Sequence, residues 1–159
     1  MNKLLVLTFL LFTHSVASQP ILVNELFDNN NNNWYQGKGE NYSLKIENGK
    51  YHMITYQKDK GRYVTISPYI DSKKDFALEA TLIQKSGSND NGFGLLWGDN
   101  SDGKYHDFVI TSNGYYKILT PEVGEKLNEW VEYKNIKPMG QPNQLRIEQR
   151  KGRLSCSIN

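Results

Sequence analysis

Short hydrophobic runs follow one another along the chain from Ile21 onward, separated by Gly and Asn at intervals of about 8–12 residues. Inside these runs, aliphatic and aromatic residues alternate with polar ones, which is the period of a strand with one buried face. No long stretch keeps a helical period. The pattern predicts strands at 21–27, 43–46, 51–56, 63–67, 76–84, 93–97, 105–111, 115–119, 129–135, 144–149 and 153–158. So many short strands in one domain predict two stacked antiparallel sheets.

Three glycine-containing turns predict hairpins, at Asn48-Gly49, Asn113-Gly114 and Lys151-Gly152. Asn-Gly favours a type I′ turn, in which both central residues have a positive φ. A two-residue turn at Asn113-Gly114 places Ser112 opposite Tyr115 and Ile110 opposite Lys117. In this register Tyr116 lies on the same face as Tyr105 and Asp107.

The first residues have the order of a secretory signal peptide. Lys3 is followed by the apolar run Leu4–Phe12 and by the small-residue zone Ser15–Ser18. The apolar run is about half of the roughly 20 residues that a membrane-spanning helix needs. The sequence therefore predicts a leader at 1–18, no transmembrane segment after cleavage, and a secreted, periplasmic or cell-surface protein.

Composition is compatible with a folded strand-rich domain and offers no reason to expect nucleic-acid binding. The 159 residues include 19 Lys+Arg and 17 Asp+Glu, so the chain has no charge excess that would attract a polyanion. Hydrophobic residues make up 38%, enough for a core, and the 10 Tyr and 13 Gly suit strands and turns. Cys156 is the single cysteine, so no intramolecular disulfide can form, and its alternation with Leu154 and Ile158 predicts a core position.

The titratable residues do not form a recognisable catalytic or metal motif, and we expect no cofactor. Asp75 and Glu79 share a strand face about 13 Å apart, beyond the roughly 5–10 Å of glycosidase carboxylates. His52 and His106 have no second ligand at zinc spacing. The segment Asp99–Gly103 resembles a calcium loop but departs from its ligand register, so a hairpin turn is the favoured interpretation and calcium the alternative.

Aromatic residues are the remaining functional signal, because Tyr and Trp present flat apolar faces with a polar tip that suit pyranose rings. Alternation places Trp97 in the core, and the indoles of Trp34 and Trp130 are also candidates for packing. Glycines between large side chains, as in Gly92-Phe93-Gly94, mark close backbone approach. The predicted ligand patch consists of Tyr105, Asp107, Thr111 and Tyr116, with the Trp34-Tyr35 loop as the second candidate.

Several segments together resemble the concanavalin A-like lectin/glucanase jelly-roll domains of secreted bacterial proteins, close to the laminin-G-like and keto-disaccharide-hydrolase-like groups. The segments are Phe27-Asp28, Asn33–Tyr35, Ile46–Tyr51, Asp75–Ala80, Asn91–Trp97, Tyr105–Lys117 and Asn143–Glu148. The resemblance implies an all-β jelly-roll sandwich over residues 19–159, lacking a final strand expected after Ile158. Nothing matches the Glu-x-Asp-x-(x)-Glu strand of the glucanase branch, so hydrolytic activity is not implied.

The favoured function is an exported, non-catalytic binding module for a glycan or other extracytoplasmic polymer. One alternative is a sugar-processing hydrolase-like enzyme of the same superfamily. The other is an assembly module that completes its sheet with a partner strand.

Overall fold

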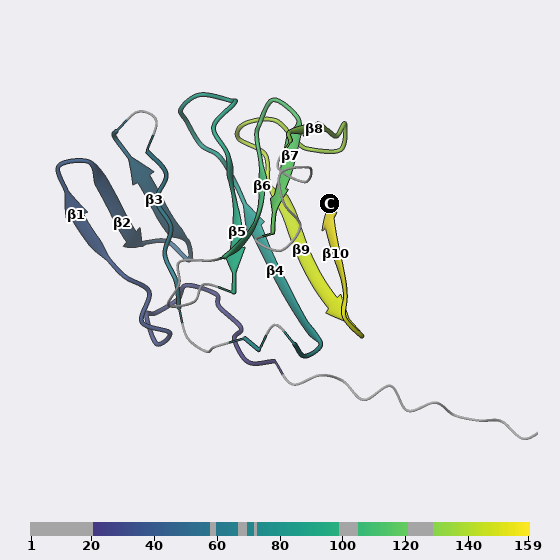
Figure 1. Cartoon of the computed structure of the whole chain (residues 1–159). Coiled ribbons are helices and arrows are strands. Elements are labelled where there is room, and N and C mark those ends of the chain that lie inside the picture. Colours follow the sequence, from purple (N-terminus) through teal and green to yellow (C-terminus); the bar gives the residue numbers. More distant parts are fainter. Residues whose placement is uncertain (1–20, 58–59, 67–69, 72, 99–104, 121–128) are drawn as a thin grey trace, which may run out of the picture. The chain divides into compact units, whose positions relative to one another are not determined.

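The computed structural model of the chain describes residues 21–57, 60–66, 70–71, 73–98, 105–120 and 129–159, and every regular element in these ranges is a β-strand. The strands form three antiparallel sheets, which confirms the all-β prediction (Figure 1). The chain divides into two compact units, Met1–Lys60 and Gly61–Asn159. The predicted leader 1–18 and the calcium alternative at 99–103 lie outside the described residues.

The first unit contains one three-stranded sheet in the order β1-β2-β3, with β1 at Gly37–Gly39, β2 at Tyr42–Ile46 and β3 at Tyr51–Thr55. The turn between β2 and β3 is the predicted type I′ turn, because Asn48 and Gly49 have φ values of 53° and 65°. Two backbone hydrogen bonds close it, from Glu47 N to Lys50 O at 2.9 Å and from Lys50 N to Glu47 O at 3.2 Å.

The second unit contains two sheets. The three-stranded sheet has the order β10-β9-β4, with bounds β4 Phe76–Leu82, β9 Asn143–Arg150 and β10 Arg153–Ile158. The four-stranded sheet has the order β5-β6-β7-β8, with bounds β5 Phe93–Trp97, β6 His106–Ile110, β7 Tyr115–Leu119 and β8 Val131–Glu132. Lys151 and Gly152, at φ 51° and 73°, form the predicted turn between β9 and β10.

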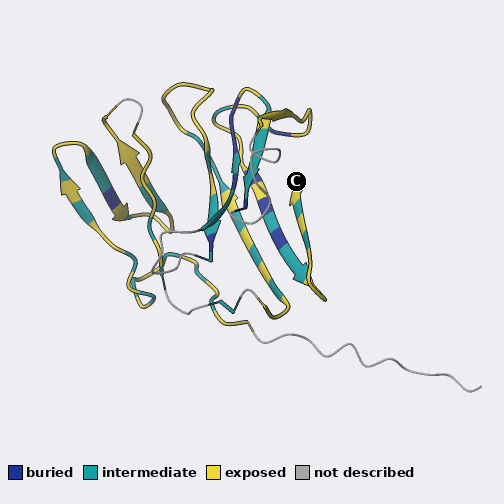
Figure 2. Ribbon diagram, viewed as in Figure 1, coloured by how far each residue is buried: buried dark blue, intermediate teal, exposed yellow. Residues whose placement is uncertain are grey.

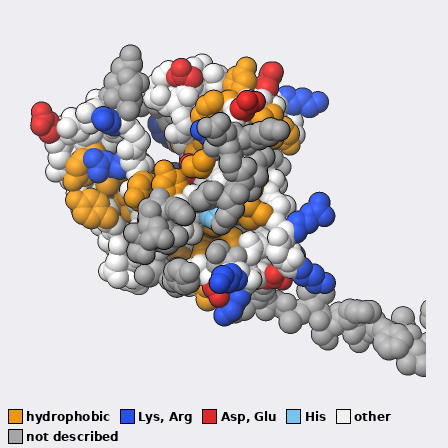
Figure 3. All heavy atoms as spheres, viewed as in Figure 1, with side chains coloured by type: hydrophobic (Ala, Val, Ile, Leu, Met, Phe, Trp, Pro, Cys, Tyr) orange, Lys and Arg blue, Asp and Glu red, His pale blue; other side chains and the backbone are white. Residues whose placement is uncertain are grey.

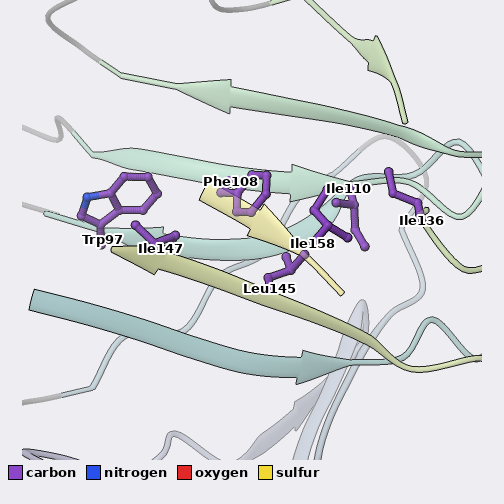
Figure 4. Close-up of a cluster of buried hydrophobic side chains, with 7 residues drawn as sticks. All are labelled: Trp97, Phe108, Ile110, Ile136, Leu145, Ile147 and Ile158. Atoms are coloured by element: carbon purple, nitrogen blue, oxygen red, sulfur yellow. The ribbon is translucent and has the colours of Figure 1, made fainter. Parts of the chain in front are cut away.

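The core of the second unit lies between its two sheets. Trp97, Phe108 and Ile110 come from the four-stranded sheet, and they cluster with side chains of the other sheet and with Ile136 (Figure 4). The residues from the three-stranded sheet are Leu145, Ile147 and Ile158. Buried and more exposed positions alternate along the strands, as the pattern predicted (Figure 2). Full burial of such a side chain contributes about 1.5–3 kcal/mol, so this cluster is the main apolar stabilisation of the unit.

Cys156 packs against this core cluster, as its position in the strand pattern predicted. Burial raises the pKa of its thiol to about 11. A thiol held in the protonated form is a poor nucleophile, which fits a packing role.

Two predicted strands are absent among the described residues, and a third is reduced to two residues. Residues 21–27 form no strand, because the Glu25 carboxylate accepts a hydrogen bond from the Phe27 backbone N–H (2.6 Å) and Phe27 itself has a φ of 58°. Residues 63–66 also lack strand structure. The predicted strand at 129–135 is reduced to β8, since the bond from Ile136 N to Tyr133 O turns the chain. β1 was not predicted.

The hairpin between β6 and β7 differs from its predicted register by one residue. Thr111 N bonds to Tyr115 O (2.8 Å) and Gly114 N to Thr111 O (3.1 Å), so three residues form the loop. Of these, Gly114 alone has a positive φ, 97°, which is the form of a type I turn followed by a glycine bulge. Ile110 therefore pairs with Tyr116, and the predicted pairing of Ile110 with Lys117 is wrong.

Candidate functional site

The outer face of β5–β8 is the side of the four-stranded sheet that points away from the core cluster. Paired residues in antiparallel strands share a face, so the register defines which side chains lie there. Three rows cross it: Leu96, Asp107 and Leu119; Gly94, Val109 and Lys117; and Tyr115 with Glu132. Unlike the core side, this face mixes apolar, aromatic and charged groups.

Trp130 lies on this face, over a gap in the sheet surface left by Gly92. A Cβ at Gly92 would be 3.2 Å from Cη2 of Trp130, so the absence of a side chain makes room for the indole. The Trp130 side chain is nevertheless 45% exposed, and Lys117 Nζ is 6.0 Å from its ring centroid. The result is an aromatic plane supported from below, accessible to solvent and close to a cation.

Asp107 is the carboxylate of the same face and is half-buried. Its Oδ1 atom is buried and has no hydrogen-bond partner among the described residues. Burial raises the pKa of Asp107, opposed by a hydrogen bond from the Leu119 backbone and by the charge of Lys117. A carboxylate that is poorly compensated in this way is costly to keep charged.

Tyr105 precedes β6 and alternates with Asp107 along the chain. Its ring centroid lies 6.2 Å from that of Tyr63, which is 58% exposed. The two tyrosines add aromatic surface next to the start of β6. Figure 3 shows that hydrophobic side chains reach the surface in several patches on the face drawn there.

The structure brings only part of the predicted patch together. Asp107 lies on the outer face and Tyr105 beside it, but Thr111 is 2% exposed, and its hydroxyl bonds to the backbone N and O of Tyr115. Tyr116 points to the core side, where its ring contacts Phe108 at 6.4 Å. The one-residue difference in register explains the position of Tyr116, because it moves every β7 side chain to the opposite face.

The second predicted candidate, the Trp34-Tyr35 loop, belongs to the first unit. Trp34 Nε1 donates to Glu25 Oε2 (2.8 Å), and its ring packs against Phe27 and Tyr51 at centroid distances of 5.2 and 5.0 Å. These contacts give Trp34 a packing role. Tyr35 is 54% exposed, and its hydroxyl shares a hydrogen bond of 3.0 Å with the Tyr42 hydroxyl.

Trp130 was predicted to be a packing residue, although the sequence contained a signal for its position on this face. Two glycines flank Phe93, and both mark close approach: Gly92 to the Trp130 ring and Gly94 to the backbone of β6. No pattern in the sequence predicted that β7 pairs with β8, and this pairing brings residue 130 to this part of the sheet.

The outer face of β4, β9 and β10 is different, because its charges bind one another. Arg146 contacts Glu79 at 3.2 Å and Glu148 at 3.5 Å, and Glu148 contacts Arg150 at 2.5 Å. The hydrogen bond from Arg150 is the largest of the effects that lower the pKa of Glu148. The charged side chains of this face form ion pairs with one another, so they are less available to bind a ligand.

Neither a metal site nor a membrane span emerges from the part of the chain that the structure describes. Its residues contain no group of three or more His, Cys, Asp or Glu that could hold a metal ion, and no helix long and apolar enough to cross a membrane. Comparison with protein-family models, curated proteins and solved structures gives no match.

Proposed function

We propose that the chain is an exported, non-catalytic binding module whose ligand, a glycan, lies on the outer face of β5–β8. The half-exposed indole of Trp130 beside Lys117 carries this proposal. The C–H face of a sugar ring packs on an aromatic plane, and its hydroxyl groups accept hydrogen bonds from an ammonium group. Tyr115 extends the aromatic surface beside this point, and Tyr105 adds an aromatic ring farther along the sheet, roughly 13 Å from the Val109–Lys117 pair.

The proposed fold is a concanavalin A-like jelly roll. Support comes from the two facing sheets of the second unit and from the sequence segments that resemble this family. Export is proposed from the order of charged, apolar and small residues in the leader.

Binding is favoured over glycoside hydrolysis by the surroundings of Asp107. Hydrolysis generally needs two carboxyl groups about 5–10 Å apart, facing each other across the scissile bond. The residues that pair with Asp107 across the neighbouring strands are Leu96 and Leu119, both apolar. Asp107 is therefore assigned a role in shaping the face rather than in acid–base chemistry.

Affinity electrophoresis tests this proposal. Residues 19–159 are run in gels containing xylan, mixed-linkage β-glucan, galactomannan or alginate, as wild type and as Trp130→Ala. We expect one polysaccharide to retard the wild type, and the substitution to weaken binding roughly threefold to tenfold, since aromatic stacking contributes about 0.5–1.5 kcal/mol beyond burial.

Tyr56→Ala is the matched control, because Tyr56 is a 57% exposed aromatic residue in the first unit. It should leave retardation unchanged. Absence of retardation for the wild type, or equal retardation of the Trp130 variant, would overturn the proposal.

A further inference from the structure

A hollow of about 250 Å³ opens where the β6–β7 turn meets the segment that follows β8. Residues 112–114 form one wall, and the other consists of Glu132, Tyr133, Lys134, Ile136 and Pro138. The volume is below the roughly 300–1,000 Å³ of pockets for drug-sized ligands. The hollow therefore suits a single small ring rather than a large cofactor.

The walls of this hollow are held in place by hydrogen bonds. Tyr133 N donates to Gly114 O at 2.8 Å, which joins the two walls directly. Asn143, only 1% exposed, accepts from Lys137 N (2.8 Å) and donates to Lys137 O (3.0 Å). A site fixed in this way loses little conformational entropy when a ligand binds.

The Ser112 hydroxyl of the lining is bound to Gln84 Oε1, but other polar groups around the hollow keep hydrogen-bonding capacity for a ligand. Glu132 and Lys134 line it, and neither forms an ion pair with another described residue. Asn113 adds an exposed side-chain amide, and Tyr133 Oη accepts from Asn135 (3.3 Å), which leaves its own proton to donate. One carboxylate and one ammonium group cancel in charge, so the lining matches a neutral polyhydroxylated ring better than an anion.

Glu132 lies between this hollow and the ring of Trp130. It pairs with Tyr115 on the outer face, two residues after Trp130. Positions two residues apart along an extended chain are about 7 Å apart and share a side. A ligand stacked on Trp130 can therefore extend along the edge of β8 into the hollow.

We propose that the hollow binds the sugar residue adjacent to the one stacked on Trp130, so that the site selects oligosaccharides of neutral sugars over monosaccharides. This inference rests on the proposed function. It goes further because it assigns a second subsite, in which Glu132 and Lys134 form hydrogen bonds with the hydroxyl groups of the sugar.

Isothermal titration with the mono-, di-, tri- and tetrasaccharide of the retained polysaccharide tests the second subsite. We expect affinity to rise at least tenfold from the monosaccharide to the trisaccharide. Glu132→Gln should lower trisaccharide affinity on the order of tenfold, because it removes a charge-assisted hydrogen bond, and should leave monosaccharide affinity unchanged. Lys134→Met provides a second variant with the same expected pattern.

Glu129→Gln is the control, since Glu129 is exposed on the same segment but does not line the hollow. If no polysaccharide is retained, the proposed function and the subsite both fail. If retention depends on Trp130 but affinity is independent of length, or if the Glu132 and Lys134 variants bind like the Glu129 control, the subsite alone is overturned. Retention by alginate alone would also overturn the neutral-sugar assignment.

Discussion

The two outer faces of the second unit contrast in how their polar groups are satisfied. On the sheet of β4, β9 and β10, Glu79, Arg146, Glu148 and Arg150 form a continuous ladder of ion pairs. On the sheet of β5–β8, Asp107 has a buried oxygen without a partner among the described residues, and Lys117 lies beside an aromatic ring.

This difference indicates which face is committed to the fold and which is available for binding. A charge already paired within the protein must lose that partner before it can bind a ligand. A supported aromatic ring with an adjacent cation loses nothing comparable. We therefore expect substitutions on the two faces to differ in their effects on stability and on its pH dependence.

The largest effect is expected at Gly94, where the outer face of β5–β8 has no room for a side chain. A Cβ there would lie 2.0 Å from Phe108 O and 2.7 Å from Val109 Cα, both backbone atoms of β6. Gly94→Ala should therefore separate β5 from β6 and lower the free energy of unfolding by at least about 3 kcal/mol. Urea denaturation measures the change.

Gly61→Ala is the matched control for Gly94, because no atom lies within 4 Å of a Cβ at Gly61. It should change stability by less than about 0.5 kcal/mol. Equal stability of the two variants would contradict the close approach of β5 and β6.

Replacing a carboxylate should change the stability by a smaller amount, and the sign of the change at pH 7 should differ between the two faces. Burial raises the folded-state pKa of Asp107, so its contribution is present at low pH and is lost as the pH rises through that pKa. Asp107→Asn removes this loss and should stabilise the protein at pH 7 by up to about 1 kcal/mol. Thermal midpoints between pH 3 and pH 8 provide the measurement.

The contribution of Glu148 to stability should have the opposite pH dependence. The hydrogen bond from Arg150 lowers its folded-state pKa, so its contribution is present above the unfolded pKa and is lost as the pH falls through the folded one. Glu148→Gln should therefore reduce stability at pH 7 and have little effect at pH 3. The same pH dependence for both variants would show that the two faces do not differ as described.

The hairpins show how much of this arrangement could be read from sequence. Asn48-Gly49 and Asn113-Gly114 have the same dipeptide, yet the first forms a type I′ turn and the second a type I turn with a glycine bulge. At the second turn, the Thr111 side chain binds the backbone of Tyr115, and Asn113 N donates to Asn89 O (3.0 Å). These contacts, within the hairpin and to the distant residue Asn89, favour the longer loop, and a dipeptide alone cannot predict them.

The predicted register of β7 was wrong by only one residue, but this error changed which residues belong to the candidate site. Most strand positions and the core residues Phe108 and Ile110 follow from local alternation, so they were predictable. The partners of β7 depend on loop length, and a shift of one moved Tyr116 to the core and Lys117 to the outer face. The glycines at 92 and 94 indicate a close approach at this point but not that Trp130 makes it, since the pairing of the two-residue strand β8 with β7 positions the indole.

The smallest effect is expected from the ion-pair ladder itself. Glu79 contacts Arg146 at 3.2 Å and accepts from Gln144 Nε2 at 2.8 Å, but the side chains of Glu79 and Arg146 are 46% and 39% exposed. Solvent and salt screen such a pair, so Glu79→Gln should cost less than about 0.5 kcal/mol in low salt and still less in 1 M NaCl. Polysaccharide retardation should stay at the wild-type level, because this face is not the proposed binding face. A loss of retardation as large as that of Trp130→Ala, in a variant with an unchanged thermal midpoint, would place the ligand on the ladder and reverse the assignment of the two faces.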